Sequence, residues 1–175
     1  DTAWSLKERG SEAHEHLCDV ADKDQVAAMV ARAMELFGGV DLLVNNAGIC
    51  VYGTVTETSE QEWDRVIGVN LKSQFLCAKE VVPHMEATGH GAIVNVASVQ
   101  SFMSQARVAA YSASKTGILG LTRAIAVDHA PKIRCNAVCP GTVDTPMLAD
   151  AIKESPDPQA VLQECHDMHL TGRIA

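Results

Sequence analysis

Short apolar runs alternate with longer segments of helical periodicity along this chain. Four runs predict strands, and they lie at 13–19, 40–45, 92–96 and 133–138. The run at 40–45 stays apolar until it meets two asparagines, as expected of a strand that is buried on both faces. Strands that alternate with helices predict an α/β fold, in which a parallel sheet carries helices on both faces.

Capping residues mark the ends of the predicted helices. Asp22 precedes a periodic segment that ends before Gly38, the residue type that commonly terminates a helix. Ser59 and Glu62 have the spacing of a capping box, which predicts the start of a second, longer helix. A third helix is expected at about 110–129.

Beyond residue 140 the periodicity loosens. Short helices are expected at 149–153 and 159–169, separated by a proline-rich break at 156–158. We expect residues 145–170 to form a lid over a substrate, within a single domain that takes in 1–175.

Composition and charge narrow the classes of protein. With 47% hydrophobic and 21% charged residues, the chain has none of the polar bias that marks disorder. Its 14 Lys and Arg are scattered among 22 Asp and Glu, which argues against a nucleic-acid partner. The apolar runs are shorter than the roughly 20 residues of a membrane span, and no secretory signal pattern precedes them. We therefore expect a cytoplasmic protein without a membrane partner.

The six cysteines form no Cys-x-x-Cys pair and no regular framework. They indicate small buried side chains in a reducing compartment. Cys165 and His169 would share one helical face, but two ligands on one turn do not complete a metal site. We expect no metal, and a cysteine or metal redox protein is the weakest of the functions considered.

Polar residues follow the predicted strands at their carboxyl ends. Asp19 and Val20 end the first strand, Asn46 follows the second, Ser98 follows the third, and 140–145 form a turn after the fourth. Ligands of open α/β sheets bind in the crevice at this edge. The sequence therefore predicts a ligand site there.

The most specific pattern is Tyr111 followed four residues later by Lys115. On a helix this spacing places a phenol and an ammonium on one face. A tyrosine with an ordinary pKa near 10 is a poor base at neutral pH unless a cation favours its phenolate, which Lys115 could do. Ser98 could hydrogen-bond a substrate oxygen beside the phenol. Asn70 lies in an apolar stretch of the long helix, where a polar network would best account for it.

Together these residues resemble the short-chain dehydrogenase/reductase family over nearly the whole chain. The matching elements, in order, are Asp19-Val20, Asn45-Asn46-Ala47-Gly48, Asn70, Ser98, Tyr111 with Lys115, and Pro140-Gly141-Thr142-Val143-Asp144-Thr145. Each element is weak alone, and six in order are strong.

The resemblance implies a Rossmann-type, doubly wound parallel sheet in three α/β/α layers. It also implies a catalytic tetrad of Asn70, Ser98, Tyr111 and Lys115. Tyr111 would exchange the proton and Ser98 would hold the substrate oxygen. Lys115 would lower the pKa of the tyrosine and bind the nicotinamide ribose, while Asn70 would help to hold a water linked to the lysine.

The cofactor implied by the resemblance is NAD or NADP. Its contacts would come from Asp19, Val20, Asn46, Ala47, Gly48, Tyr111, Lys115, Pro140, Gly141, Val143 and Thr145.

The resemblance predicts an oxidoreductase that transfers a hydride between this cofactor and a small alcohol or ketone, such as a polyol, a sugar or a 3-oxo compound. A homodimer or homotetramer is expected. The alternative is a catalytically idle relative that senses dinucleotide. The family's glycine-rich pyrophosphate turn and its last strand do not occur in these residues, so we expect N-terminal and C-terminal parts of the fold to be missing.

Overall fold

Three parallel strands form the sheet in the described part of the chain. The computed structural model describes residues 2–155 and 157–175. The strands are β1 (Leu42–Asn45), β2 (Gly91–Val96) and β3 (Ile133–Val138), hydrogen-bonded in the order β1-β2-β3. In register, Val44 lies beside Val94, which lies beside Asn136. The predicted α/β class with a parallel sheet is therefore confirmed.

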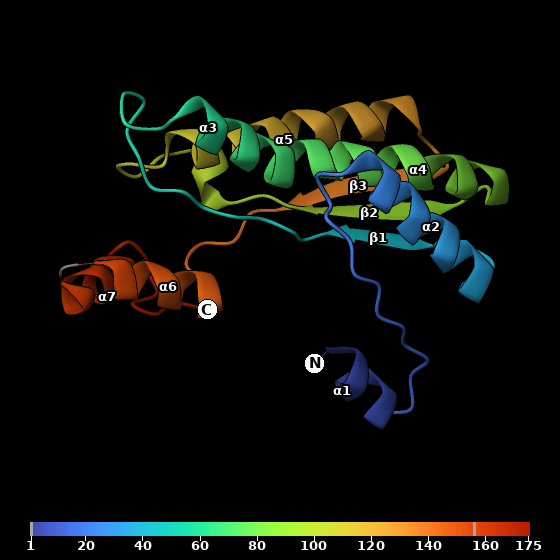
Figure 1. Ribbon diagram of the computed structural model, residues 1–175, viewed down its shortest axis with the longest axis horizontal. Helices are drawn as coiled ribbons and strands as arrows, with labels where there is room; N and C mark the ends of the chain where they lie inside the picture. Colours follow the sequence, from blue (N-terminus) through green and yellow to red (C-terminus); the bar gives the residue numbers. More distant parts are fainter. Residues whose placement is uncertain (1, 156) are drawn as a thin grey trace.

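Four helical segments cover one face of this sheet (Figure 1). They are α2 (Lys23–Phe37), α3 (Glu60–Ile67), α4 (Ser73–Thr88) and α5 (Ala109–Asp128). A short π-helical turn, η1 (Gly68–Lys72), joins α3 to α4, and the 3-10 turn η2 (Val99–Ser101) precedes α5.

Local capping explains where these helices begin. The Asp22 side chain accepts hydrogen bonds from the backbone N–H groups of Asp24 and Gln25. Ser59 and Glu62 form the predicted capping box, each side chain bonding the other's backbone N–H. These signals act within one turn, so the sequence alone located both helix starts.

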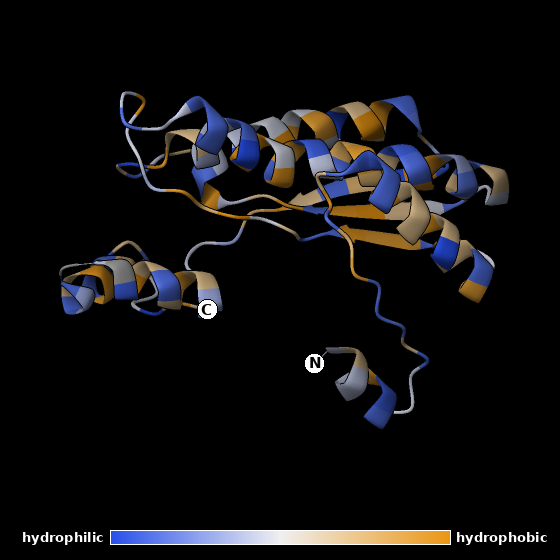
Figure 2. Cartoon of the chain, in the orientation of Figure 1, coloured by the Kyte–Doolittle hydropathy of each residue, from blue (hydrophilic) through white to orange (hydrophobic). Residues whose placement is uncertain are grey.

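The core lies between the sheet and its helical layer. Its members are Val30, Ala78, Val81, Val82, Met85, Ile93, Ile125, Ile133 and Cys135. The sheet is among the most apolar parts of the molecule (Figure 2). On the other face Leu42 is 56% exposed and Val44 is 53% exposed. Within residues 2–155 and 157–175, helices therefore cover only one of the two faces that an α/β/α sandwich covers.

The remaining helices stand away from the sheet. Helices α6 (Pro146–Glu154) and α7 (Pro158–Asp167) lie beyond the carboxyl end of β3, and α1 (Thr2–Glu8) lies at the other end of the described chain (Figure 1). The proline-rich break falls between α6 and α7, with Pro156 itself outside the described residues. None of the described helices is long and apolar enough to span a membrane.

The predicted strand at 13–19 is wrong. These residues have no regular secondary structure, and Leu17 is fully exposed. A strand is stabilised by the ladder it shares with a neighbour, and no described strand lies beside this segment. The sequence pattern gave no sign of α1, whose residues are not buried.

Candidate active site at the carboxyl ends of the strands

Asn70 fixes the segment that follows β1 by hydrogen bonds to its backbone. It lies in the π-helical turn η1 and is fully buried. Its Oδ1 accepts a hydrogen bond from the Ile49 N–H at 2.8 Å, and its Nδ2 donates to the Ile49 carbonyl at 2.9 Å and to Ser114 Oγ at 3.0 Å. A single-turn π-bulge often marks a functional position in a helix. The polar network expected around Asn70 is thus present, and it ties the β1 loop to α5.

Lys115 is buried against the same segment. Its Nζ donates a hydrogen bond to the Val96 carbonyl at 2.8 Å, and only 4% of the residue is exposed. A Cβ on Gly48 would lie 3.4 Å from this Nζ and 3.6 Å from Asn70 Oδ1, at ordinary contact distance, so the backbone at Gly48 runs beside both groups. Burial lowers the pKa of Lys115 to about 8, opposed by the nearby thiols of Cys139 and Cys50.

Tyr111 lies beside Ser98 at the carboxyl ends of the strands. Burial raises the pKa of Tyr111 above its ordinary value, while a side-chain hydrogen bond with Ser98 lowers it and the Cys50 thiol raises it. Ser98 is 8% exposed and caps η2 by accepting a hydrogen bond from the Gln100 N–H at 3.2 Å.

The expected lowering of the Tyr111 pKa by Lys115 is not found. Lys115 Nζ lies 5.5 Å from the centre of the Tyr111 ring, and it is not among the groups that shift the pKa of the phenol. The amine points instead at the Val96 carbonyl, and its own burial disfavours its charge. In this structure desolvation is therefore the main cause of the raised pKa of Tyr111.

A buried chain of amides links the strands beneath the site. Asn45 Nδ2 donates to Asn95 Oδ1 at 2.9 Å, and Asn95 Nδ2 donates to Thr122 Oγ1 at 2.9 Å. Ser101 Oγ donates to the Lys115 carbonyl at 2.8 Å. Sequence analysis missed this network, because the amides pair with residues 27 and 50 positions away. The network holds β1, β2 and α5 in fixed register.

The turn at 140–145 meets the end of the chain that follows α7. Thr142 N–H donates to His169 Nε2 at 3.0 Å, and Ala175 bonds the Thr142 carbonyl and the Asp144 N–H at 3.0 and 2.8 Å. The Pro140 carbonyl accepts from the Val99 N–H at 2.9 Å, which fixes the turn to η2. The turn is therefore held on two sides beside Ser98.

The structure gathers the predicted site residues unevenly. Gly48, Asn70, Ser98, Tyr111 and Lys115 come together as described above. Other predicted cofactor residues lie at the same edge of the sheet with exposed or half-buried side chains: Asn46, Ala47, Pro140, Gly141, Val143 and Thr145.

Asp19 and Val20 lie just before α2, whose N-cap is Asp22. Asp19 Oδ1 accepts from the Ala21 N–H, and the Asp19 N–H donates to Gln25 Oε1, both at 2.9 Å. No described interaction joins either residue to Tyr111 or Lys115.

Thiols and a second phenol, which the sequence did not single out, also lie near the tetrad. Burial, together with smaller contributions from the Cys50, Cys165 and Tyr111 side chains, raises the pKa of Tyr52 to about 12. Tyr52 in turn hydrogen-bonds Cys50. Tyr52, which follows β1, therefore lies near both Tyr111 and Cys165 of α7.

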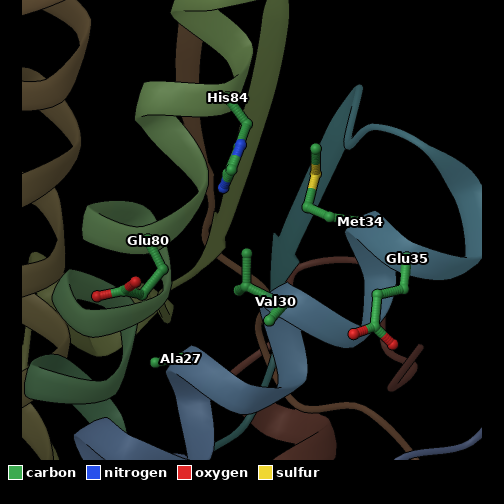
Figure 3. Close-up of a pocket in the computed structure, with 7 residues that line it drawn as sticks. Ala27, Val30, Met34, Glu35, Glu80 and His84 are labelled. Atoms are coloured by element: carbon green, nitrogen blue, oxygen red, sulfur yellow. The ribbon is translucent and has the colours of Figure 1, made fainter.

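A groove of about 500 Å³ lies elsewhere, between α2 and α4 (Figure 3). Its lining is Ala27, Val30, Ala31, Met34, Glu35, Glu80 and His84. In Figure 3, Glu80 and His84 project from one helix and Met34 and Glu35 from the other. No group of three described His, Cys, Asp or Glu residues could hold a metal ion, here or elsewhere. We place the site at the strand ends, because a phenol, an amine and a hydroxyl converge there.

Comparisons with known proteins identify relatives of this chain. The family model "short chain dehydrogenase" matches residues 1–156. An uncharacterized oxidoreductase of Thermotoga maritima is 43% identical over 176 residues, covering 99% of this chain and 67% of that protein. A 3beta-hydroxysteroid dehydrogenase of Mediterraneibacter gnavus is 46% identical over 145 residues, covering 82% of this chain and 52% of that protein.

A solved structure is similar as well. The ligand-free aldohexose dehydrogenase of Thermoplasma acidophilum has a TM-score of 0.87 and 37% identity, covering 97% of this chain and 69% of that one. These matches confirm the Rossmann-type fold class. The chain spans between about half and two thirds of the length of the curated relatives described here.

Proposed function

Because this chain belongs to the short-chain dehydrogenase family, we propose that its protein transfers a hydride between NAD or NADP and a small hydroxyl compound or its ketone. The observation that carries the proposal is the convergence of Ser98, Tyr111 and Lys115 at the carboxyl ends of parallel strands. An open α/β sheet binds its ligand at this edge.

The described residues fit the nicotinamide half of a dinucleotide. An ammonium has three N–H donors, and only one described hydrogen bond uses Lys115 Nζ, which leaves two donors for ribose hydroxyls. In the turn at 140–145, the backbone N–H groups of Thr142 and Asp144 are bonded within the chain. Val143 and Thr145 would meet the nicotinamide side, and Asn46 to Gly48 would lie beside the adenosine ribose. When bound, the dinucleotide accepts or donates the hydride.

The proton of the reaction passes through Tyr111. In alcohol oxidation the phenolate form of Tyr111 takes the hydroxyl proton, and in ketone reduction the neutral phenol donates it. Ser98 orients the substrate oxygen by a hydrogen bond beside the phenol. Lys115 is mostly protonated at pH 7, since its pKa is about 8, and its positive charge favours the phenolate when the amine turns toward it.

Asn70 supports this arrangement through its hydrogen bonds to the Ile49 backbone. By fixing both backbone groups of Ile49, it sets the path of the β1 loop past Lys115. A water held by Asn70 would connect Lys115 to solvent and carry the proton away.

The substrate is proposed only as a class. Two similar proteins are described as a hydroxysteroid dehydrogenase and an aldohexose dehydrogenase, so the name of each refers to a compound that carries hydroxyl groups. We propose that residues 100–108 and the segment 145–170, as a lid within the single domain, select among such compounds.

A homodimer or homotetramer is part of the proposal. Phe75 on α4 is 48% exposed and Val127 on α5 is 78% exposed, so apolar side chains are available on the outer surface of this layer. Light scattering on the full-length protein measures the number of subunits directly.

The competing function is a catalytically idle sensor of dinucleotide. A sensor needs the ribose contacts of Lys115 but has no use for Ser98 beside a phenol. The experiment measures NADH and NADPH binding by fluorescence and turnover by nicotinamide absorbance, over a panel of sugars, polyols and cyclic ketones. We expect turnover that Ser98→Ala reduces while dinucleotide affinity is kept. Tight dinucleotide binding with no turnover on any panel member would favour the sensor.

A further inference from the structure

His169 makes two hydrogen bonds whose partners determine its protonation. The residue follows α7, and its Nδ1 lies 2.6 Å from the Cys165 carbonyl oxygen of that helix. Its Nε2 accepts from the Thr142 N–H at 3.0 Å, 27 residues earlier in the chain. A carbonyl oxygen can only accept and a backbone N–H can only donate. His169 must therefore be neutral, with its proton on Nδ1.

The chain leaves room for this ring at Gly141. A Cβ at position 141 would come into severe contact with His169 Nε2 and would lie 3.2 Å from Cδ2. Gly141 does not have a positive φ, so space and not backbone conformation requires glycine here. The ring thus packs directly on the backbone of the turn at 140–145.

The hydrogen bonds reach one edge of the turn. Thr142 bonds His169 and Ala175, and the Asp144 N–H bonds the Ala175 carbonyl. Among the described hydrogen bonds, none uses the N–H groups of Val143 and Thr145. The chain after α7 therefore holds Thr142 and Asp144, and the N–H groups of Val143 and Thr145 stay available to a ligand.

We propose that neutral His169 is a positioning residue, which fixes the 140–145 turn for dinucleotide by accepting the Thr142 N–H. The proposal rests on the proposed function, since it assigns the nicotinamide side to Val143 and Thr145. It makes the segment after α7 part of the cofactor site without any contact between His169 and the dinucleotide.

Two amide variants of the full-length protein separate this role from simple packing. In His169→Gln the side-chain oxygen reaches the position of Nε2 and can still accept from Thr142. In His169→Asn the shorter amide can bond the Cys165 carbonyl but does not reach Thr142. We expect His169→Asn to weaken NADH or NADPH binding by roughly 3- to 10-fold, the loss of one hydrogen bond, with kcat at saturating dinucleotide nearly unchanged. His169→Gln should bind as the wild type does.

Gly141→Ala provides an independent check through a double-mutant cycle. The added methyl group displaces the ring, so Gly141→Ala alone should weaken dinucleotide binding about as much as His169→Asn. Combined with His169→Asn, it should add little, because the ring is already gone. Equal effects of His169→Asn and His169→Gln, or additive effects in the cycle, would overturn the proposal.

Two NMR measurements test the positioning without any dinucleotide. The ring ¹⁵N shifts should show a protonated Nδ1 and an unprotonated Nε2 in His169. Hydrogen exchange of the Thr142 amide should be slow in the wild type and in His169→Gln, and fast in His169→Asn. If the wild type bound neither NADH nor NADPH, the proposed function would be contradicted. If the His169 ring were protonated on Nε2, or if the Thr142 amide exchanged at the same rate in the wild type, His169→Gln and His169→Asn, the role of His169 would be contradicted.

Discussion

Replacing Asn70 by alanine should destabilise the protein by about 3 kcal/mol. The fully buried amide makes three hydrogen bonds, two to the backbone of Ile49 and one to Ser114 Oγ, at 2.8 to 3.0 Å. Each contributes about 1 kcal/mol net, within a range of about 0.5 to 1.5 kcal/mol, and none of the three partners gains a replacement in the variant. For a domain of this size the change corresponds to a fall in Tm of roughly 6 to 12 °C.

Urea unfolding of the full-length protein measures this free energy, with Gln61→Ala as the matched control. Gln61 is an exposed amide in α3, on the same continuous helical stretch, with no described hydrogen bond. Its replacement should change the free energy of unfolding by no more than about 0.5 kcal/mol. If Asn70→Ala changed the free energy of unfolding as little as Gln61→Ala, the hydrogen bonds of Asn70 to Ile49 and Ser114 would not stabilise the protein, and the reasoning would be refuted.

Three further results are expected. Lys115 has a pKa of about 8 in the folded protein and an ordinary pKa of 10.5, so between these pH values the unfolded chain binds more protons than the folded one. The free energy of unfolding of the wild type, relative to that of Lys115→Met, should therefore rise by about 3 kcal/mol as the pH increases from 8 to 10.5. If it did not rise, the burial of a charge at Lys115 would be contradicted. Burial raises the pKa of both Tyr111 and Tyr52. The difference between the ultraviolet titrations of the dinucleotide-free wild type and of Tyr111→Phe should therefore show no Tyr111 phenolate at pH 9. Phenolate at that pH would mean that Lys115 already lowers the pKa of Tyr111. Gln74 is buried with neither amide atom hydrogen-bonded, so Gln74→Met should increase the free energy of unfolding by about 1 to 3 kcal/mol, whereas a loss of stability would point to an ordered water on that amide.

Local signals in the sequence located much of the fold. Asp22, and Ser59 with Glu62, begin their helices by hydrogen bonds within a single turn, so their residue types suffice. The strand at 133–138 was predicted with its observed bounds, and its buried Ile133 and Cys135 alternate with the exposed Arg134 and Asn136, as on a strand with one buried face. The segment 13–19 failed for the opposite reason, since a strand also needs a neighbour and the described chain supplies none.

The site was predictable as a set of residues but not as a geometry. Spacing placed Tyr111 and Lys115 on one helical face, yet the direction of the Lys115 amine depends on the Val96 carbonyl, 19 residues away. The partners of Asn70, and Thr142 as the partner of His169 Nε2, lie 21 to 44 residues distant, so no periodicity in the sequence could indicate them. The sign of the Tyr111 pKa change likewise follows from burial, which only the folded chain establishes.

The most direct test of the central claim is the rate of hydride transfer in Tyr111→Phe. The variant removes the phenolic oxygen and keeps the ring, so dinucleotide binding should persist while proton transfer is lost. We predict that the single-turnover rate at saturating dinucleotide falls by roughly 10²- to 10⁴-fold, the usual contribution of a general acid or base. A variant that transferred hydride at the wild-type rate would show that another group carries the proton, and the assignment of this site would be wrong.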